Sequence, residues 1–212
     1  MASSDSDELI ESRRQHVADH WNLDSEVVLV RSGSLVPIAG SDLQYEFRPH
    51  PDFAYLAGYG VADAVLAYDA KDQRWQLFGP RSTADEMVWH QPANEIGLPI
   101  TELDEWLKKR EQQPLIESHN DLKIESGIAE TRLRKDELEL SALRFAAATS
   151  EAGFSWVYDN VTAGMTEREI QIGIEAEFFR AGAVRTAYPS IVASGPNAAY
   201  LHYFYGQDYS LN

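Results

Sequence analysis

AYPSIVASGPNAAYLHY, residues 187–203, is the stretch on which the interpretation of this chain depends. Its apolar run at residues 190–193 predicts a buried strand. Ser-Gly-Pro-Asn at residues 194–197 predicts a turn, because glycine adopts positive φ, proline fixes φ and asparagine tolerates the left-handed region. The chain then returns to His202 and Tyr203. We expect His202 to lie beside a sheet, either as a structural histidine or as a donor to a carbonyl or oxyanion.

Two helix starts precede this stretch. Asp136 with Glu139, and Thr166 with Glu169, each place a capping residue three positions before a glutamate, which is the pattern of a capping box. Apolar residues then recur at helical spacing in both segments: Leu140, Leu143, Ala147 and Phe154 in the first, and Ile170, Ile174 and Phe178 in the second. Gly182 follows the second segment as a C-cap. The sequence therefore predicts two helices that lead into residues 187–203.

The N-terminal half predicts a mixed α/β domain. Helices are expected at residues 6–21, 82–89 and 101–112, the last capped by Thr101, and strands at residues 27–30, 64–68 and 74–78. Pro114, a polar run and Gly127 then interrupt the periodicity. We therefore expect one domain over residues 1–112, an extended linker over residues 113–130 and a second domain over residues 131–212.

Composition excludes several classes of function. The chain has 212 residues, 44% of them hydrophobic, which suffices for packed cores. With 34 acidic and 18 basic residues its formal charge is −16, which disfavours nucleic acids and anionic membranes as partners. It has no cysteine, so disulfide and thiol chemistry are excluded. Residues 1–15 lack the apolar core of a signal peptide, and no run reaches the ~20 apolar residues of a membrane helix, so we expect a cytoplasmic protein.

Residues 187–203 closely resemble the first active-site segment of the Xaa-Pro aminopeptidases and prolidases, which are metallopeptidases with a pita-bread catalytic fold. RLRKDELELSALRFAAATSEAG, residues 132–153, and TAGMTEREI, residues 162–170, resemble the two helices before that segment in the family. YEFRPHPDFAYLAGY, residues 45–59, resembles the signature of the family's N-terminal domain. The resemblance implies a mixed α/β chain: a creatinase/prolidase-type N-terminal domain followed by the opening portion of a pita-bread domain.

The resemblance also implies an activity and its cofactors. Members of the family hydrolyse the bond before a proline with two divalent metal ions, commonly manganese. An Xaa-Pro aminopeptidase releases the N-terminal residue from peptides that have proline in second position. The family's ligands are two aspartates, a histidine and two glutamates downstream of the LHY segment, and this sequence ends before the first of them. We therefore expect no metal ligand within this chain and no peptidase activity from the chain alone.

Three site residues are implied by the resemblance. His202 would bind the substrate and steady the tetrahedral intermediate without binding metal. Tyr188 would line the substrate site and support the metal centre. Trp89 would reach the active site of a neighbouring subunit in a homo-oligomer, a dimer or a tetramer. Tyr203, next to His202, is a further candidate.

Alternative functions remain open from the sequence. The first is a prolidase, a dipeptidase that cleaves the same bond; residues 45–59 match the aminopeptidase type better. The second is a non-catalytic pita-bread domain that serves as a binding module. The third is a serine hydrolase that uses Ser190 or Ser194 with His202, which is disfavoured because no nucleophile elbow surrounds either serine.

Overall fold

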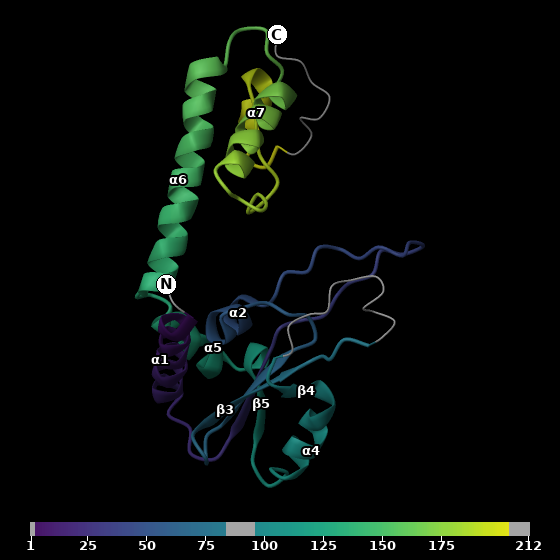
Figure 1. The fold of residues 1–212 in the computed structure, drawn as a ribbon, viewed down its shortest axis with the longest axis vertical. Helices are drawn as coiled ribbons and strands as arrows, with labels where there is room; N and C mark the ends of the chain where they lie inside the picture. Colours follow the sequence, from purple (N-terminus) through teal and green to yellow (C-terminus); the bar gives the residue numbers. More distant parts are fainter. Residues whose placement is uncertain (1–2, 84–95, 204–212) are drawn as a thin grey trace. The chain divides into compact units, whose positions relative to one another are not determined.

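The computed structural model describes residues 3–83 and 96–203 (Figure 1). The chain divides into two compact units, Met1–Lys135, called the sheet unit, and Asp136–Asn212, called the helical unit. Trp89, with most of the helix expected at residues 82–89, lies outside the described residues.

A mixed five-stranded sheet organises the sheet unit, so the expected α/β class is confirmed. The strands are Val27–Arg31 (β1), Val65–Asp69 (β2), Arg74–Gly79 (β3), Leu98–Pro99 (β4) and Leu115–Glu117 (β5). Their spatial order is β4-β3-β2-β1-β5. β1, β2 and β3 pair in antiparallel fashion, whereas β4 and β5 add to the two edges as parallel strands. The three strands expected at residues 27–30, 64–68 and 74–78 are confirmed as β1, β2 and β3.

Both faces of the central strands are covered. Because successive side chains of a strand point to opposite faces, Val28 and Val30 pack into one cluster while Val27 and Leu29 pack into the other. The first cluster holds residues of α1 (Ser3–Trp21), α2 (Pro51–Ala57) and α5 (Leu122–Thr131), and the second holds Leu103 of α4 (Leu103–Lys108). Figure 1 shows α1 and α5 on one side of the sheet and α4 on the other. This double coverage explains why β1 and β2 read as continuous apolar runs.

Trp21 is the centre of the larger cluster. It ends α1, has no exposed surface, and its indole N–H donates to the carbonyl oxygen of Ile124 over 3.0 Å. Its ring lies 5.7 Å from the ring of Tyr68 and 5.5 Å from the ring of Trp75. One side chain thereby joins α1 to α5 and to the sheet.

Two expectations for the sheet unit differ from the structure. Residues 101–112 form a short 3₁₀ turn (η1, Ile100–Glu102) followed by α4, and Thr101 lies inside the turn and does not cap a helix. Residues 113–130 do not form an extended linker: they contribute β5, a second 3₁₀ turn (η2, Ser118–Asn120) and α5 to the sheet unit. The reason is tertiary pairing, since β5 bonds to β1 and Ile124 is fully buried beneath Trp21.

Two helices form the body of the helical unit, as predicted. These are α6 (Glu137–Asn160) and α7 (Glu167–Arg180), and both begin with the expected capping box. Gly182 follows α7 with φ of 100°, where its N–H donates to Phe179 over 3.0 Å and the next N–H, of Ala183, donates to Phe178 over 2.9 Å. This paired bonding is a Schellman motif, which confirms Gly182 as the glycine that ends the helix, directly after the C-cap residue Ala181.

Glycines allow α6 and α7 to approach each other closely. A Cβ atom on Gly173 of α7 would lie 1.9 Å from the ring of Trp156 on α6. A Cβ atom on Gly153 of α6 would lie 2.3 Å from the ring of Phe178 on α7. The aromatic rings of each helix therefore occupy the space that a larger residue would need on the other.

The strand expected at residues 190–193 is not formed. Residues 189–194 have no regular secondary structure, and a 3₁₀ turn (η3, Gly195–Ala199) follows. A strand is stable only when its backbone groups pair with a neighbour, and no segment in the described part of the helical unit is a strand. The apolar run alone therefore cannot make the strand.

Candidate functional site

The turn before His202 has the chemistry expected from its residues. Gly195 adopts φ of 48°, the left-handed value that glycine tolerates best. The N–H of Asn197 donates to the carbonyl oxygen of Ser194 over 3.0 Å, and the N–H of Tyr200 donates to that of Asn197 over 3.1 Å. These bonds fold residues 194–200 into a compact turn, which leads to His202 two residues later.

A buried carboxylate holds this turn. Glu167, the first residue of α7, is 2% exposed. Its Oε1 accepts the Ser194 N–H over 2.6 Å and the Ser194 hydroxyl over 3.1 Å. The Asn197 side-chain amide donates to Oε1 and Oε2, both over 3.2 Å. A carboxylate so buried is stable only when donors satisfy its charge, and the turn supplies them.

The same contacts set the protonation state of Glu167. Burial raises the pKa of its carboxyl group, but hydrogen bonds from Asn197 and from the Ser194 backbone and hydroxyl, together with the influence of the Tyr203 side chain, outweigh that effect. The pKa of Glu167 therefore lies below its ordinary value. At neutral pH the turn is held by an ionised carboxylate.

The predicted site residues have different surroundings. His202 is exposed, whereas Tyr203 is 5% exposed and contributes to the environment of Glu167. Tyr188 is 67% exposed and lines a cavity to which His202 does not contribute. Tyr203 is therefore buried near the turn, whereas Tyr188 lines a cavity whose wall residues do not include His202.

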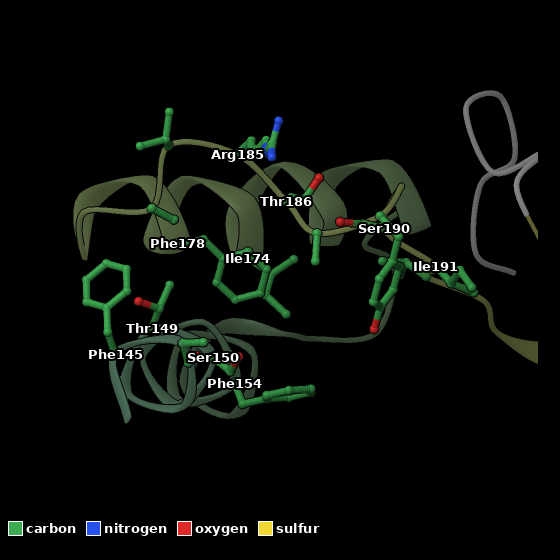
Figure 2. A pocket seen from close by; sticks show the side chains of 16 residues that line it. Phe145, Thr149, Ser150, Phe154, Ile174, Phe178, Arg185, Thr186, Ser190 and Ile191 are labelled. Atoms are coloured by element: carbon green, nitrogen blue, oxygen red, sulfur yellow. Dashed lines mark hydrogen bonds between the residues drawn. The ribbon is translucent and has the colours of Figure 1, made fainter. Parts of the chain in front are cut away.

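The cavity has a volume of about 490 Å³ and belongs entirely to the helical unit (Figure 2). Its walls come from α6, from α7 and from residues 183–192. Phe145 and Phe154 of α6 and Phe178 of α7 make it mainly apolar. The hydroxyl of Thr149, also in the wall, is buried and finds no hydrogen-bond partner among the described residues. The cavity can therefore take an apolar group.

Glu167 is the residue that reading the sequence missed. It follows the N-cap Thr166 directly, where an acidic residue is common because the helix dipole favours negative charge. Glu169, which closes the capping box, is an acidic residue of the same helix turn. The local sequence does not show that Glu167 is buried whereas Glu169 is exposed. The difference follows from the contacts of Glu167 with Ser194 and Asn197, which lie 27 and 30 positions further along the chain.

The described residues lack a group of metal ligands and a membrane-spanning helix. Over residues 3–83 and 96–203, no three or more His, Asp or Glu side chains gather in a way that could hold a metal ion. The helices in the same ranges include none that is both long and apolar enough to cross a membrane.

Two known families match successive parts of this chain. Residues 10–97 match the family described as "Aminopeptidase P, N-terminal domain", and residues 141–212 match "Metallopeptidase family M24". The chain therefore resembles the N-terminal part of proteins of the Xaa-Pro aminopeptidase family.

Curated relatives agree with this assignment. The "Probable Xaa-Pro aminopeptidase" of Botryotinia fuckeliana is 27% identical over 209 residues, which cover 84% of this chain and 44% of the relative. That of Sclerotinia sclerotiorum is 28% identical over 203 residues, covering 84% of this chain and 37% of the relative. The chain thus spans less than half the length of these curated relatives.

Solved structures show the same fold. Aminopeptidase P from E. coli superposes with a TM-score of 0.78 at 20% identity, covering 93% of this chain and 55% of that one. Aminopeptidase PepP from Pseudomonas aeruginosa superposes with a TM-score of 0.77 at 21% identity, covering 96% of this chain and 55% of that one. These comparisons confirm the expected architecture of an N-terminal domain followed by the start of a pita-bread domain.

Proposed function

We propose that this chain is the N-terminal part of a metal-dependent aminopeptidase that releases the first residue from peptides with proline in second position. The observation that carries the proposal is an exposed histidine, His202, that follows a turn held by a buried carboxylate, within residues that match the metallopeptidase family. The names of the curated relatives support the same substrate class.

In this proposal His202 contacts the substrate directly. A neutral imidazole can donate one N–H to the carbonyl oxygen of the scissile bond, and the same donor stabilises the oxyanion that forms when the carbonyl is attacked. The turn before His202 limits the backbone freedom of that donor. A donor held in place before the reaction stabilises the transition state more effectively than a mobile one.

Divalent metal ions are part of the proposed function. The family name implies divalent metal ions, and the proposed ions are two manganese ions. The described residues include no group of ligands that could hold these ions. The ligands would come from other parts of the assembled enzyme.

Specificity for proline has a physical reason. The bond before proline is a tertiary amide without an N–H, and the proline ring restricts the backbone. A site that selects such a peptide recognises the ring and does not need a hydrogen bond from that position. Tyr188, exposed at the cavity wall, is proposed to line this site. Trp89, outside the described residues, is proposed to approach it from a second subunit of a dimer or tetramer in the cytoplasm.

One substitution tests the role of His202. In an assembled enzyme that contains this chain, His202→Ala should lower the turnover of Xaa-Pro peptides by about 10²-fold, as the loss of one oxyanion donor does. Metal content, measured by elemental analysis, should remain unchanged. Parallel loss of metal would make His202 a ligand and contradict the role proposed for it.

A second experiment tests the chain by itself. Intact mass, metal analysis and a peptidase assay on the 23.8 kDa chain should show no tightly bound metal pair and no cleavage. Cleavage by this chain alone would contradict the proposal that it supplies only part of the site. An assembled enzyme that binds Xaa-Pro peptides without cleaving them would instead support the binding-module alternative.

A further inference from the structure

We infer that Glu167 is a positioning residue of the substrate site, which fixes the turn that leads to His202. The inference rests on the proposed function in one respect, namely that His202 contacts the substrate. Glu167 is buried, so in this inference it acts through His202 and not by contacting the substrate. The evidence is the set of contacts around one buried carboxylate.

The first set of contacts lies before His202. Three hydrogen bonds join Oε1 of Glu167 to the backbone N–H and hydroxyl of Ser194 and to the side chain of Asn197, and a fourth joins Oε2 to Asn197. These two residues begin and stabilise η3. The carboxylate therefore holds the start of the turn, eight residues before His202, and also its middle, five residues before.

The residue that follows His202 is buried. Tyr203 is 5% exposed, and its side chain contributes to the lowered pKa of Glu167. His202 itself is exposed, between the turn and the buried Tyr203. Because Glu167 holds the turn by four hydrogen bonds, the segment that carries His202 has fewer conformations left, and the direction of the imidazole is restricted.

The anchor itself is rigid. Glu167 is the first residue of α7, and the capping box of Thr166 and Glu169 fixes the same helix turn. Gly173 and Trp156 then hold α7 against α6 at close distance. Residues 189–194 have no strand neighbours among the described residues, so Glu167 provides the contact that a sheet would otherwise provide.

The charge and shape of Glu167 are both required. A carboxylate offers acceptors on both oxygens, and all four of the bonds to the turn are donated to it. A glutamine has the same shape, but its NH₂ group would face one of these donors. Glu167→Gln therefore breaks the match with almost no change of volume.

Glu169→Gln is the matched control. It removes the same charge from the same helix turn, and glutamine at this position still completes a capping box. Among the described residues, the Glu169 side chain accepts hydrogen bonds from Thr166 only, so the control leaves the turn at Ser194 unchanged. Any effect of charge at the helix start appears in both variants, whereas release of the turn appears only in Glu167→Gln.

Amide hydrogen exchange of this chain measures the anchoring without any assay of activity. The reporters are the N–H groups of Ser194, Asn197 and Tyr200, each of which donates a hydrogen bond in the folded state. Glu167→Gln should speed their exchange by about tenfold or more, because the local opening equilibrium loses charge-assisted bonds, and Glu169→Gln should change it less than about twofold. Equal exchange in the two variants would overturn the inference.

Asn197→Ala provides an independent variant if Glu167→Gln does not fold. It removes two of the four bonds while the carboxylate and its helix remain intact. The Ser194 and Tyr200 amides should again exchange faster. Unchanged exchange at both amides would contradict the inference.

Kinetics on an assembled enzyme that contains this chain separate positioning from simple stability. Glu167→Gln should lower kcat for an Xaa-Pro peptide by about tenfold at constant metal content, and this effect should vanish in a His202→Ala background, because the residue acts through His202. Additive effects of the two substitutions would overturn the positioning role. If the assembled enzyme cleaves no Xaa-Pro peptide at all, the proposed function fails, and the exchange rates still decide whether Glu167 holds the segment.

Discussion

The sheet unit and the helical unit bury their apolar residues to very different extents. In the sheet unit, Val28, Leu29 and Leu66 have no exposed surface. In the helical unit, Phe154 and Tyr158 are 65% and 91% exposed, and Tyr203 is the one buried hydrophobic residue among those described. The sheet unit thus buries its apolar residues within its own core, whereas many apolar side chains of the helical unit remain exposed among its described residues.

The difference shows which interactions hold each unit. Apolar burial is the main stabilising term in most domains, and it dominates in the sheet unit. The helical unit depends more on specific contacts: two capping boxes, the close approach at Gly173 and the Glu167 carboxylate. Specific contacts of this kind order a segment without adding a large core.

The largest expected effect comes from separating the units. A fragment of residues 1–135 should unfold cooperatively in urea, because its core lies entirely within it. A fragment of residues 136–212 should unfold over a broad range and bind a hydrophobic dye, because its apolar side chains are exposed. Circular dichroism and dye fluorescence measure both. A sharp transition without dye binding in the second fragment would show that the helical unit also buries its apolar side chains, which would contradict the difference between the units.

A matched pair of aromatic truncations should give the next largest effect. Trp21→Ala should lower the free energy of unfolding by about 3–5 kcal/mol, because it leaves a cavity and removes the hydrogen bond to Ile124. Phe154→Ala should change it by less than about 0.5 kcal/mol, since that side chain is largely exposed. Urea denaturation measures both values. Equal losses would mean that Phe154 is buried in solution.

Gly173→Ala tests the close approach of α6 and α7. Alanine usually stabilises a helix by about 1 kcal/mol relative to glycine. Here its Cβ atom would meet the Trp156 ring, so we expect a net loss of about 1–3 kcal/mol in the helical unit. Ile172→Ala, at the exposed neighbouring position, is the control and should change stability by less than about 0.5 kcal/mol. A stabilised Gly173→Ala variant would show that the two helices do not pack closely.

The smallest effect concerns pH. The pKa of Glu167 is lowered in the folded state, so its stabilising contribution is complete above the unfolded carboxyl pKa of about 4.3 and is lost as pH falls through the folded value. The difference in unfolding free energy between the wild type and Glu167→Gln should therefore shrink between neutral and strongly acidic pH. Thermal denaturation across this range measures it. A difference that stays constant with pH would contradict an ionised Glu167.

Glu169→Gln is the control for the pH experiment. The pKa of Glu169 is also lowered, by hydrogen bonds from the backbone and side chain of Thr166. Because Glu169 is exposed, solvent screens its charge, and its pH-dependent difference should be smaller than that of Glu167. The comparison of the two glutamates isolates the effect of burial.

Several elements could be predicted from the sequence because their signals are local. The capping boxes at Asp136 and Thr166 each involve residues three positions apart, and both form as predicted. The Gly182 cap and the turn at Gly195 depend on the backbone freedom of one residue. The strands β1 and β2 appear as apolar runs because both of their faces are buried. The family assignment rests on sequence segments of the same kind.

Other features were decided only by tertiary structure. β5 and α5 replace the expected linker because β1 and Trp21 bind them from far along the chain. Residues 190–193 have the composition of a strand but lack a partner among the described residues, and Glu167 resembles any acidic residue at a helix start until Ser194 and Asn197 meet it. Local sequence specifies capping and turn preference through atoms a few residues apart. Pairing and burial depend on which distant segments arrive, and the sequence pattern does not contain that information in any single window.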